Sequence, residues 1–549
     1  MRILLSLLTL AAVGLGPAGH DGGLGPSAVA ADAPRPNTEA VLLRWHFQGT
    51  ARLAGNTEGT LLRDVCALPS TRRLVEEALS KLARAPQEQC RTQLTSTNLD
   101  TAALLRPLLD DLVQAESFGE CRGTTPATAE WSLAVRLDAA RAQVWDGNSR
   151  QLSAAFGGTA PRAAQAAGFD GWESTRPSAP TRLRLLRAGG WVVVSWGNGR
   201  LSAQDQMLER LRGSGHPATA GNGWLDLEAD LAHWAPALGL PMSIPWPRAR
   251  MTGQGRGPSV RSNVELVFPR PLDLALAEWQ IPTNTIREPL ISFTAVQGLR
   301  AWLQAQPWVK QLGIDQPPNQ LFAWGLSQVP FETYAMWRMP NSATVLPRIA
   351  KALPGVIETN FPLLKVGEVT WEPRYSQILW RRLPILVPYL QPAPGPDHDF
   401  VLAGVFPTTL TNQPPGPPEL FSQVLDRTNL VYYDWEITQN RLQDWRSLIS
   451  LYSMVAGYVP PPTNSAAYRW LMDTNLVSHL GNAATEVTVV NPRVLAVTRT
   501  SSVGFTGLEL ALLARWVDSP TFPAYRAPEL ISQWRQRRHP ATPPPRLGP

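Results

Sequence analysis

The sequence predicts an α+β fold in which largely antiparallel sheets are built from hairpin-then-helix units, with helices packed on one face. Three observations lead to this fold class: strand-like alternation that runs directly into helical periodicity, several hairpins each followed by an amphipathic helix, and 52 prolines that separate short elements. Hydrophobic residues make up 44% and charged residues 17% of the 549 residues, which is typical of a folded globular protein. No fixed repeat length emerges, so a regular solenoid is excluded.

The stretch 429–457 shows the strand-to-helix unit most clearly. Its first half alternates apolar with polar residues and predicts a half-buried strand, with apolar positions at Val431, Tyr433, Trp435 and Ile437. Thr438 is a good N-cap for the amphipathic helix that follows, because its hydroxyl can accept an orphan backbone N–H of the first turn. The prolines at 460–462 prevent the helix from continuing.

The N-terminus has the pattern of a secretory signal peptide over residues 1–30. Arg2 precedes the apolar run Ile3–Val13, and a small-residue cleavage site follows at Ala28–Ala30. We therefore expect a mature chain that begins near Ala31 and resides in a periplasm or outside the cell. No later stretch reaches about 18 apolar residues free of charges and prolines, so no transmembrane segment is expected in the mature chain.

An N-terminal α+β domain is predicted over 31–250, and a helical hairpin over 71–116 lies within it. The alternation in 41–49 predicts the first strand. Leucine-rich stripes then predict helices over 71–84 and 100–116. Because two consecutive amphipathic helices bury their stripes best against each other, we expect them to pack antiparallel.

This hairpin makes the three cysteines informative. Cys66 precedes the first helix, Cys90 lies in the connection, and Cys121 follows the second helix. Folding the hairpin brings Cys66 and Cys121 to one end, whereas a helix of about 15 residues keeps Cys90 roughly 22 Å away. The sequence therefore predicts a Cys66–Cys121 disulfide, which an exporting compartment permits. Three reduced thiols are the alternative.

The rest of the first domain reads as hairpins. Residues 131–137 and 141–145 predict a short hairpin, and 181–197 predicts a stronger one that turns at Ala188-Gly189-Gly190. A helix follows at 202–212. The proline- and glycine-rich segment 241–260 is the best candidate for an interdomain linker.

A second α+β domain is predicted over 261–525, followed by a basic, proline-rich tail over 526–549 that we expect to be disordered. Pro384–Pro396 is a further proline-rich break. The predicted strands are 263–268, 291–295, 321–326, 331–337, 400–406, 486–490 and 494–500. The predicted helices, besides the one after Thr438, are 296–304, 342–353 and 507–517.

Charge and aromatic content restrict the partners. The net charge is +6, carried almost wholly by arginines scattered along the chain, and an exported protein meets little nucleic acid. We therefore expect no nucleic-acid partner, and a glycan or an envelope component is the possible kind of partner. The 21 tryptophans fit either a buried core or a sugar-stacking surface, of which the core is favoured because tryptophan is mostly buried.

Asp434 and Glu436 are the sharpest catalytic candidates. On a strand they point to the same face, about 6.6 Å apart, a spacing at which two carboxylates can serve glycoside hydrolysis. The triplet Asp434-Trp435-Glu436 resembles the end of the D-x-x-D-x-D-x-E signature of family 18 chitinases, which implies Glu436 as a catalytic acid. The chain has Tyr432 and Asn429 where that family has aspartates, and it lacks the family's eight-fold alternation of strands and helices. The alternative is the solvent face of an amphipathic strand.

Metal, cofactor and nucleophile motifs are sparse. Asp397, His398 and Asp399 form the one local group that suggests a metal or acid–base site, and a solvated cap is the alternative. No G-x-S-x-G motif, reactive-cysteine context or complete strand–GxGxxG–helix pattern occurs, so no cofactor is predicted.

The sequence therefore favours an exported, non-enzymatic binding or cell-envelope structural protein. Two alternatives stay open. One is a glycan-active hydrolase that uses Asp434 and Glu436. The other is a binder of apolar small molecules, which requires a large cavity lined by apolar side chains.

Overall fold

The computed structural model describes the chain between residues 40 and 523. The described ranges are 40–89, 100–125, 128–177, 181–199, 201–218, 223–236, 244–327, 331–360, 367–383, 386–406, 413–455, 464–519 and 522–523. The predicted signal peptide and the predicted tail lie outside them, as does Cys90. Two compact units make up the chain. Unit 1 comprises Met1–Pro269, Asn464–Trp470 and Leu513–Ala527, and unit 2 comprises Arg270–Thr463, Leu471–Leu512 and Pro528–Pro549.

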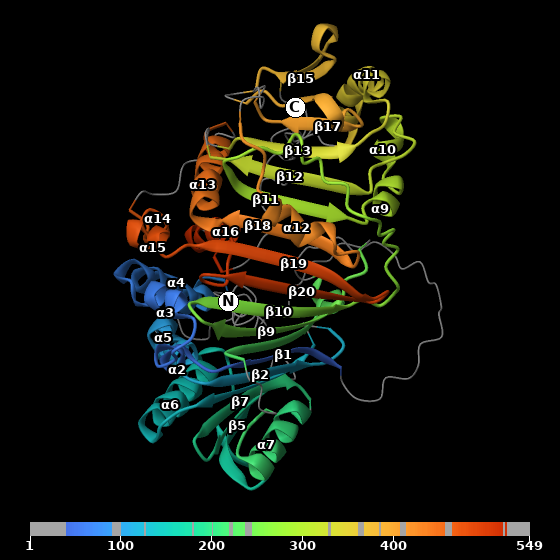
Figure 1. Cartoon of the computed structure of the whole chain (residues 1–549). Helices are drawn as coiled ribbons and strands as arrows, with labels where there is room; N and C mark the ends of the chain where they lie inside the picture. Colours follow the sequence, from blue (N-terminus) through green and yellow to red (C-terminus); the bar gives the residue numbers. More distant parts are fainter. Residues whose placement is uncertain are drawn as a thin grey trace, which may run out of the picture. The chain divides into compact units, whose positions relative to one another are not determined.

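Unit 1 is built on ten antiparallel strands in the order β4-β5-β6-β7-β3-β2-β1-β8-β9-β10 (Figure 1). The strands are β1 (Val41–Phe47), β2 (Ser117–Arg122), β3 (Glu130–Arg136), β4 (Arg162–Ala166), β5 (Phe169–Thr175), β6 (Thr181–Ala188), β7 (Trp191–Asn198), β8 (Leu225–Asp230), β9 (Arg248–Arg256) and β10 (Ser259–Val267). The helices are α2 (Thr50–Ala54), α3 (Thr60–Ala67), α4 (Pro69–Gln89), α5 (Thr101–Gln114), α6 (Ala139–Ala155), α7 (Ser202–Ser214) and α8 (Leu231–Trp234).

Helices cover both faces of the unit 1 sheet. One core joins Leu112 of α5 and Trp145 of α6 to Leu133 of β3. A second core joins Leu208 of α7 to Ala134, the next residue of the same strand. Because successive residues of a strand point to opposite faces, α6 and α7 lie on opposite sides of the sheet. The prediction that helices pack on one face is therefore wrong for this unit.

Helices α4 and α5 lie against each other. Arg106 of α5 donates to Glu76 of α4 at 2.6 Å and to Ser80 at 2.7 Å. Asp100 caps α5 by accepting the backbone N–H groups of Ala102 and Ala103, which is the role expected of aspartate at an N-cap.

Unit 2 is also built on ten antiparallel strands, in the order β14-β15-β16-β17-β13-β12-β11-β18-β19-β20 (Figure 1). The strands are β11 (Leu290–Gln297), β12 (Gln320–Leu326), β13 (Thr333–Arg338), β14 (Glu368–Glu372), β15 (Gln377–Arg381), β16 (Tyr389–Pro392), β17 (Phe400–Gly404), β18 (Leu430–Ile437), β19 (Asn482–Asn491) and β20 (Val494–Ser501). The helices after residue 270 are α9 (Arg300–Gln304), α10 (Pro307–Gln311), α11 (Ser342–Asn360), α12 (Pro418–Leu425), α13 (Thr438–Val455), α14 (Ala466–Leu471), α15 (Thr474–Ser478) and α16 (Gly507–Asp518).

The two units repeat one topology. Numbered from the first strand of each unit, both sheets have the order 4-5-6-7-3-2-1-8-9-10. A helix follows the first, third and seventh strand in both, so α6 corresponds to α11 and α7 to α12. α11 and α12 lie on opposite faces of the unit 2 sheet, as α6 and α7 do in unit 1. Leu346 of α11 packs with Val401 of β17, whereas Phe421 of α12 packs with Leu402, the next residue of that strand.

The backbone register matches in detail. Gln48-Gly49 follows β1, Gln297-Gly298 lies at the end of β11, and both glycines have φ of +85°. The pairing of strand 1 with strand 2 shifts register between Val41 and Leu43 in unit 1. It shifts between Leu290 and Ser292 in unit 2, at the same distance from the glycine. The chain is thus a tandem repeat of one α+β fold, although the sequence shows no repeat.

The α+β fold class and its extensive antiparallel pairing agree with the sequence prediction, but three local predictions were wrong. Residues 141–145 belong to α6, because Asp138 caps a helix there by accepting the Arg141 N–H at 2.8 Å. The linker predicted over 241–260 contains β9 and the start of β10, and the units divide at Pro269. The break Pro384–Pro396 contains β16. Among the described residues, no helix is both long and apolar enough to cross a membrane.

Candidate functional site

Asp434, which is half-buried, and Glu436, which is buried, are anchors within unit 2. Asp434 of β18 accepts a hydrogen bond from the Thr294 hydroxyl on β11 at 2.6 Å. Glu436 accepts the backbone N–H of Gly507, at the start of α16, at 2.7 Å. Burial raises the pKa of both carboxyls, and these bonds offset part of that rise. Neither residue lines the three cavities described below.

Asp397, His398 and Asp399 do not converge. Asp397 is buried and accepts the Thr285 hydroxyl at 2.8 Å. His398 has a side chain that is 78% exposed, and its ring lies 3.7 Å from Asp399. Asp399 in turn accepts from Arg338 at 3.3 Å. The three side chains therefore serve separate contacts, and they form no set of ligands among the described residues.

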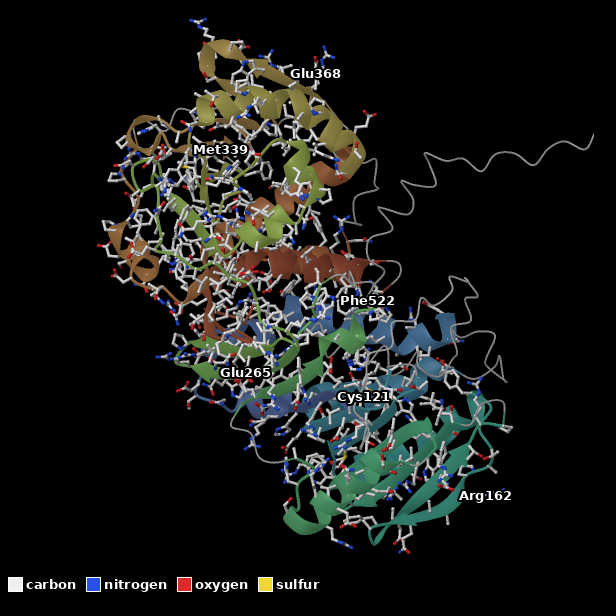
Figure 2. All side chains as sticks on the ribbon, turned by 90° about the vertical axis from the view of Figure 1, so that its right-hand side faces the viewer. Cys121, Arg162, Glu265, Met339, Glu368 and Phe522 are labelled. Carbon is white, nitrogen blue, oxygen red and sulfur yellow. The ribbon has the colours of Figure 1, made fainter. Side chains whose placement is uncertain are left out.

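The predicted Cys66–Cys121 disulfide is wrong, because both cysteines are free thiols. Cys66 is exposed on α3, whereas Cys121 is fully buried in the middle strand region of unit 1 (Figure 2), where it pairs with Leu43 and Trp131 across the neighbouring strands. The prediction placed Cys121 at a helix end, but β2 begins at Ser117 and carries it into the core. Burial raises the pKa of the Cys121 thiol, so it stays protonated and inert.

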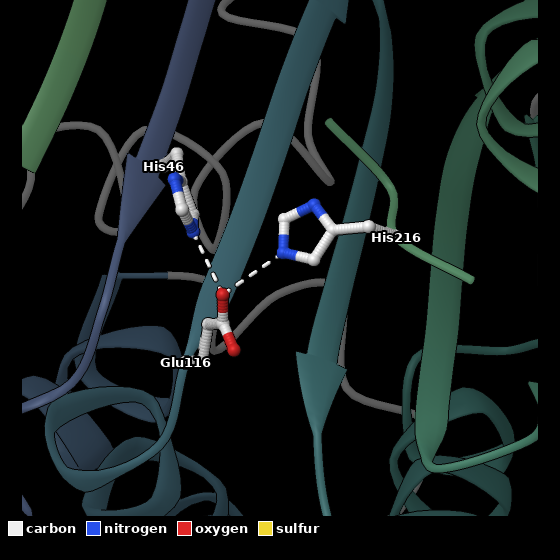
Figure 3. Close-up of side chains that lie close together, drawn as sticks. All are labelled: His46, Glu116 and His216. Atoms are coloured by element: carbon white, nitrogen blue, oxygen red, sulfur yellow. Dashed lines mark hydrogen bonds and ion pairs between the residues drawn. The ribbon is translucent and has the colours of Figure 1, made fainter. Parts of the chain in front are cut away.

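A cluster that the sequence did not reveal lies in unit 1, where His46, Glu116 and His216 meet (Figure 3). His46 is on β1, Glu116 directly precedes β2, and His216 follows α7. Both histidine Nε2 atoms lie 2.9 Å from the same Glu116 oxygen, Oε1. We call these residues the His–Glu–His cluster. Sequence separations of 70 and 100 residues leave no local motif by which it could be found.

Two members of the cluster are buried, and its contacts favour the ionised form of Glu116. His46 and Glu116 are less than a tenth exposed, and Arg136 donates to the second Glu116 oxygen at 3.2 Å. Hydrogen bonds from His46, His216 and Arg136 lower the pKa of Glu116 to about 2, against the opposing effect of burial. Glu116 is therefore a carboxylate at any physiological pH.

The outer nitrogens of the two imidazoles also face acceptors. His216 Nδ1 lies 2.9 Å from the Ala218 carbonyl oxygen. His46 Nδ1 lies 3.9 Å from Asp226 Oδ2 on β8. Among the described residues, these last two buried atoms have no hydrogen-bond partner. A buried, unsatisfied pair of this kind is costly and needs an explanation.

Two cavities adjoin the cluster. His46 lines one of about 370 Å³ together with Arg44, Arg210, Asp226 and Glu228. His216 lines another of about 290 Å³ with Arg136 and Trp191.

A buried ion network lies beside the first cavity. Glu120 is fully buried and is contacted by Arg122, by Arg210 at 3.0 Å and by Arg44 at 3.5 Å. Arg44 also lies 3.6 Å from Glu228. The face of the sheet that carries α7 is therefore strongly polar around the cluster.

Unit 2 holds an apolar cavity of about 380 Å³. Its walls come from five neighbouring strands, β14, β15, β16, β17 and β13, and from the residues around them. They are Thr333, Tyr334, Ala335, Leu353, Val369, Ile378, Trp380, Pro388, Tyr389, Leu390, Ala403, Gly404 and Val405. Tyr389 is buried, and its hydroxyl has no hydrogen-bond partner in the described part of the chain.

Comparison with known proteins adds little. No protein family model matches the chain, and no curated protein matches it significantly. Solved structures of TP0453 resemble part of it. Crystal form III is 12% identical with a TM-score of 0.24, and crystal form I is 11% identical with a TM-score of 0.23. Each alignment covers 45% of this chain and 80% of the other. Scores this low carry no inference about fold or function.

Proposed function

We propose that this chain is an exported, non-enzymatic binding protein, and that the apolar cavity of unit 2 holds an apolar small molecule. The observation that supports the proposal is the cavity itself. Protein interiors are close-packed and contain few voids larger than a water molecule. A space of about 380 Å³ lies within the range of small-ligand sites, about 300–1,000 Å³.

The chemistry of the walls indicates the ligand class. Leucine, isoleucine, valine and aromatic side chains dominate, and no charged residue lines the cavity. An apolar surface without charged side chains disfavours ions as ligands.

The competing glycan-hydrolase interpretation gains no comparable support. Asp434 bonds Thr294 of a neighbouring strand, and Glu436 bonds the first turn of α16. Both contacts hold elements of unit 2 together, and neither carboxylate lines a described cavity. An anchoring role accounts for them fully.

A fluorescence titration tests the binding site. We expect N-phenyl-1-naphthylamine, an apolar naphthalene dye, to bind the full mature chain saturably at one site. Ala403 lines the cavity and is half-buried, so the larger side chain of Ala403→Phe should fill the space. We expect this variant to bind the dye at least about tenfold more weakly, a loss of about 1.4 kcal/mol in binding free energy.

Ala323→Phe is the matched control. Ala323, Ala335 and Ala403 are consecutive cross-strand partners on one face of the sheet, and Ala323 does not line the cavity. This variant should bind the dye as the unmodified chain does. Absence of saturable binding, or equal binding by both phenylalanine variants, would refute the proposal.

A further inference from the structure

We propose that the His–Glu–His cluster of unit 1 is a binding site for a divalent transition-metal ion of the zinc type. The site is independent of the apolar cavity in unit 2. It supplies two imidazole nitrogens and one carboxylate oxygen, which is a ligand set that zinc accepts with a fourth position left open. Without a thiolate, the set excludes metals that require sulfur.

The inner geometry fits with a small adjustment. The three ligand atoms all lie within 4.8 Å of one another, and each Nε2 is 2.9 Å from Glu116 Oε1. Zinc bonds of about 2.0–2.2 Å at tetrahedral angles place neighbouring ligand atoms roughly 3.3–3.5 Å apart. Each nitrogen therefore has to move by about half an ångström from the glutamate oxygen, and the two nitrogens, which lie within 4.8 Å of each other, have to take the same spacing.

The outer contacts fit as well. Histidines that bind a metal through one nitrogen usually donate the other N–H to a carbonyl or a carboxylate, which fixes the ring. His216 Nδ1 faces the Ala218 carbonyl at 2.9 Å, and His46 Nδ1 faces Asp226. When His46 Nε2 binds a metal, its proton resides on Nδ1 and faces the Asp226 carboxylate. Metal binding thereby pairs the two buried atoms that otherwise lack a partner.

Unit 2 shows that the fold does not need these ligands. Counting back from the paired glycines, His46 corresponds to Ala295, and Glu116 corresponds to Gln320. The second copy of the fold forms the same strand pairs with an alanine and an amide at these positions. In unit 1 the histidine and the glutamate are paired with each other, and because the fold forms without either side chain, they serve the site and not the fold.

The two adjoining cavities provide access to the site. His46 lines the larger cavity and His216 the smaller one. The arrangement suits a site that exchanges its metal or binds a further ligand through it.

Isothermal titration of the full mature chain with Zn²⁺ tests the inference, using protein purified without a histidine tag and stripped with a chelator. We expect one Zn²⁺ per chain. His46→Ala and His216→Ala should each weaken binding at least about 100-fold, and Asp226→Asn about 10–100-fold, the range for residues that orient a ligand. Far-UV circular dichroism checks folding. His216 is partly exposed after α7, so its variant retains the fold even where His46→Ala does not.

His398→Ala is the matched control, because it removes an exposed histidine between two aspartates and should leave Zn²⁺ binding unchanged. Failure of the unmodified chain to bind Zn²⁺ stoichiometrically would overturn the inference. Equal binding by the folded His216→Ala variant would do the same and would mark the cluster as a buried salt bridge only. Dye binding in unit 2 should be unaffected by His216→Ala, which separates this result from the function proposed above.

Discussion

Units 1 and 2 share one strand order but differ in the chemistry of the sheet face that carries α7 or α12. Following cross-strand pairs from the first strand, one row in unit 1 reads Arg44, Glu120, Ser132 and Ser195. The corresponding row in unit 2 reads Phe293, Trp324, Tyr334 and Gly404. A buried ion network in one copy thus occupies the place of an aromatic core in the other.

The difference shows which constraints belong to the fold and which belong to a site. Trp324 and Tyr334 stack at 5.4 Å and fill the face of unit 2 with apolar surface. Glu120 and its arginines contribute no such surface, and ion pairs in protein interiors rarely stabilise more than well-packed apolar groups. Because the aromatic row satisfies the same backbone, the fold itself does not require the polar row of unit 1. The His–Glu–His cluster lies on the same face, in the adjacent row that begins at His46.

The largest effect is expected when the central charge of the polar row, Glu120, is removed. Glu120→Ala removes the shared carboxylate from Arg122, which is mostly buried, and from Arg44 and Arg210, which are about a third exposed. We expect a loss of about 3 kcal/mol in the free energy of unfolding, the lower end for a broken buried pair, because water screens two of the three cations and Arg44 keeps Glu228. Urea denaturation followed by circular dichroism measures it.

The double variant Glu120→Ala, Arg210→Met serves as the internal check. It removes one of the stranded cations, so it should be less destabilised than Glu120→Ala alone. Arg212→Ala, at an exposed arginine of the same helix, should have little effect. If Glu120→Ala costs less than about 1 kcal/mol, the network is not the counterpart of a packed core.

A second prediction compares the two glycines that the units share, Gly49 and Gly298. Gly49 and Gly298 both have φ of +85°, which L-residues rarely adopt, and ψ of 147° at Gly49 lies in a region almost restricted to glycine. A Cβ on Gly298 would meet the flexible Leu274 side chain at 2.9 Å, whereas one on Gly49 would meet the Gln114 carbonyl oxygen at 2.3 Å. We therefore expect Gly298→Ala to cost about 1–2 kcal/mol and Gly49→Ala to cost more.

Thermal or urea unfolding of the two alanine variants gives this ranking directly. Gly168→Ala is a suitable control, because it also has positive φ but no heavy atom within 4 Å of the added Cβ. It isolates the conformational cost from the steric one. Equal losses at Gly49 and Gly298 would contradict the steric part of the argument.

The sequence was a good guide where the apolar pattern is strong. The alternation around Tyr433 and the leucine stripe around Leu108 predict β18 and α5 because burial of one face determines both patterns. It failed at α6, whose buried positions include Ser149 and Ser153 and therefore show no apolar stripe. It failed at β9 because glycines and arginines there resemble a linker.

The His–Glu–His cluster could not be predicted from the sequence for a different reason. His46 and Glu116 come from separate strands and His216 from a turn, so only the pairing of β1 with β2 and the placement of α7 bring them together. The local triplet Asp434-Trp435-Glu436 was conspicuous, but its side chains are used as anchors. The strand β8 carries a similar triplet, Asp226-Leu227-Glu228. Its carboxylates face His46 and Arg44, because it is displaced by one residue relative to β18 and so points to the opposite face.

The smallest expected effect concerns Asp434 of the β18 triplet and the dependence of stability on pH. Burial raises the pKa of Asp434 above its value in the unfolded chain, about 3.9. The protonated form is therefore favoured in the folded state, and its contribution to stability is fully present below pH 3.9 and is lost as the pH rises through the folded-state pKa.

Asparagine cannot ionise and keeps the oxygen that accepts from Thr294. We expect Asp434→Asn to be more stable than the unmodified chain at pH 8 and to lose that advantage near pH 4. Urea midpoints measured across this range test it. Asp399→Asn, at an exposed carboxylate, should show no such gain. A stability gain for Asp434→Asn that is independent of pH would show that the ionised carboxylate is not destabilising the strand pair.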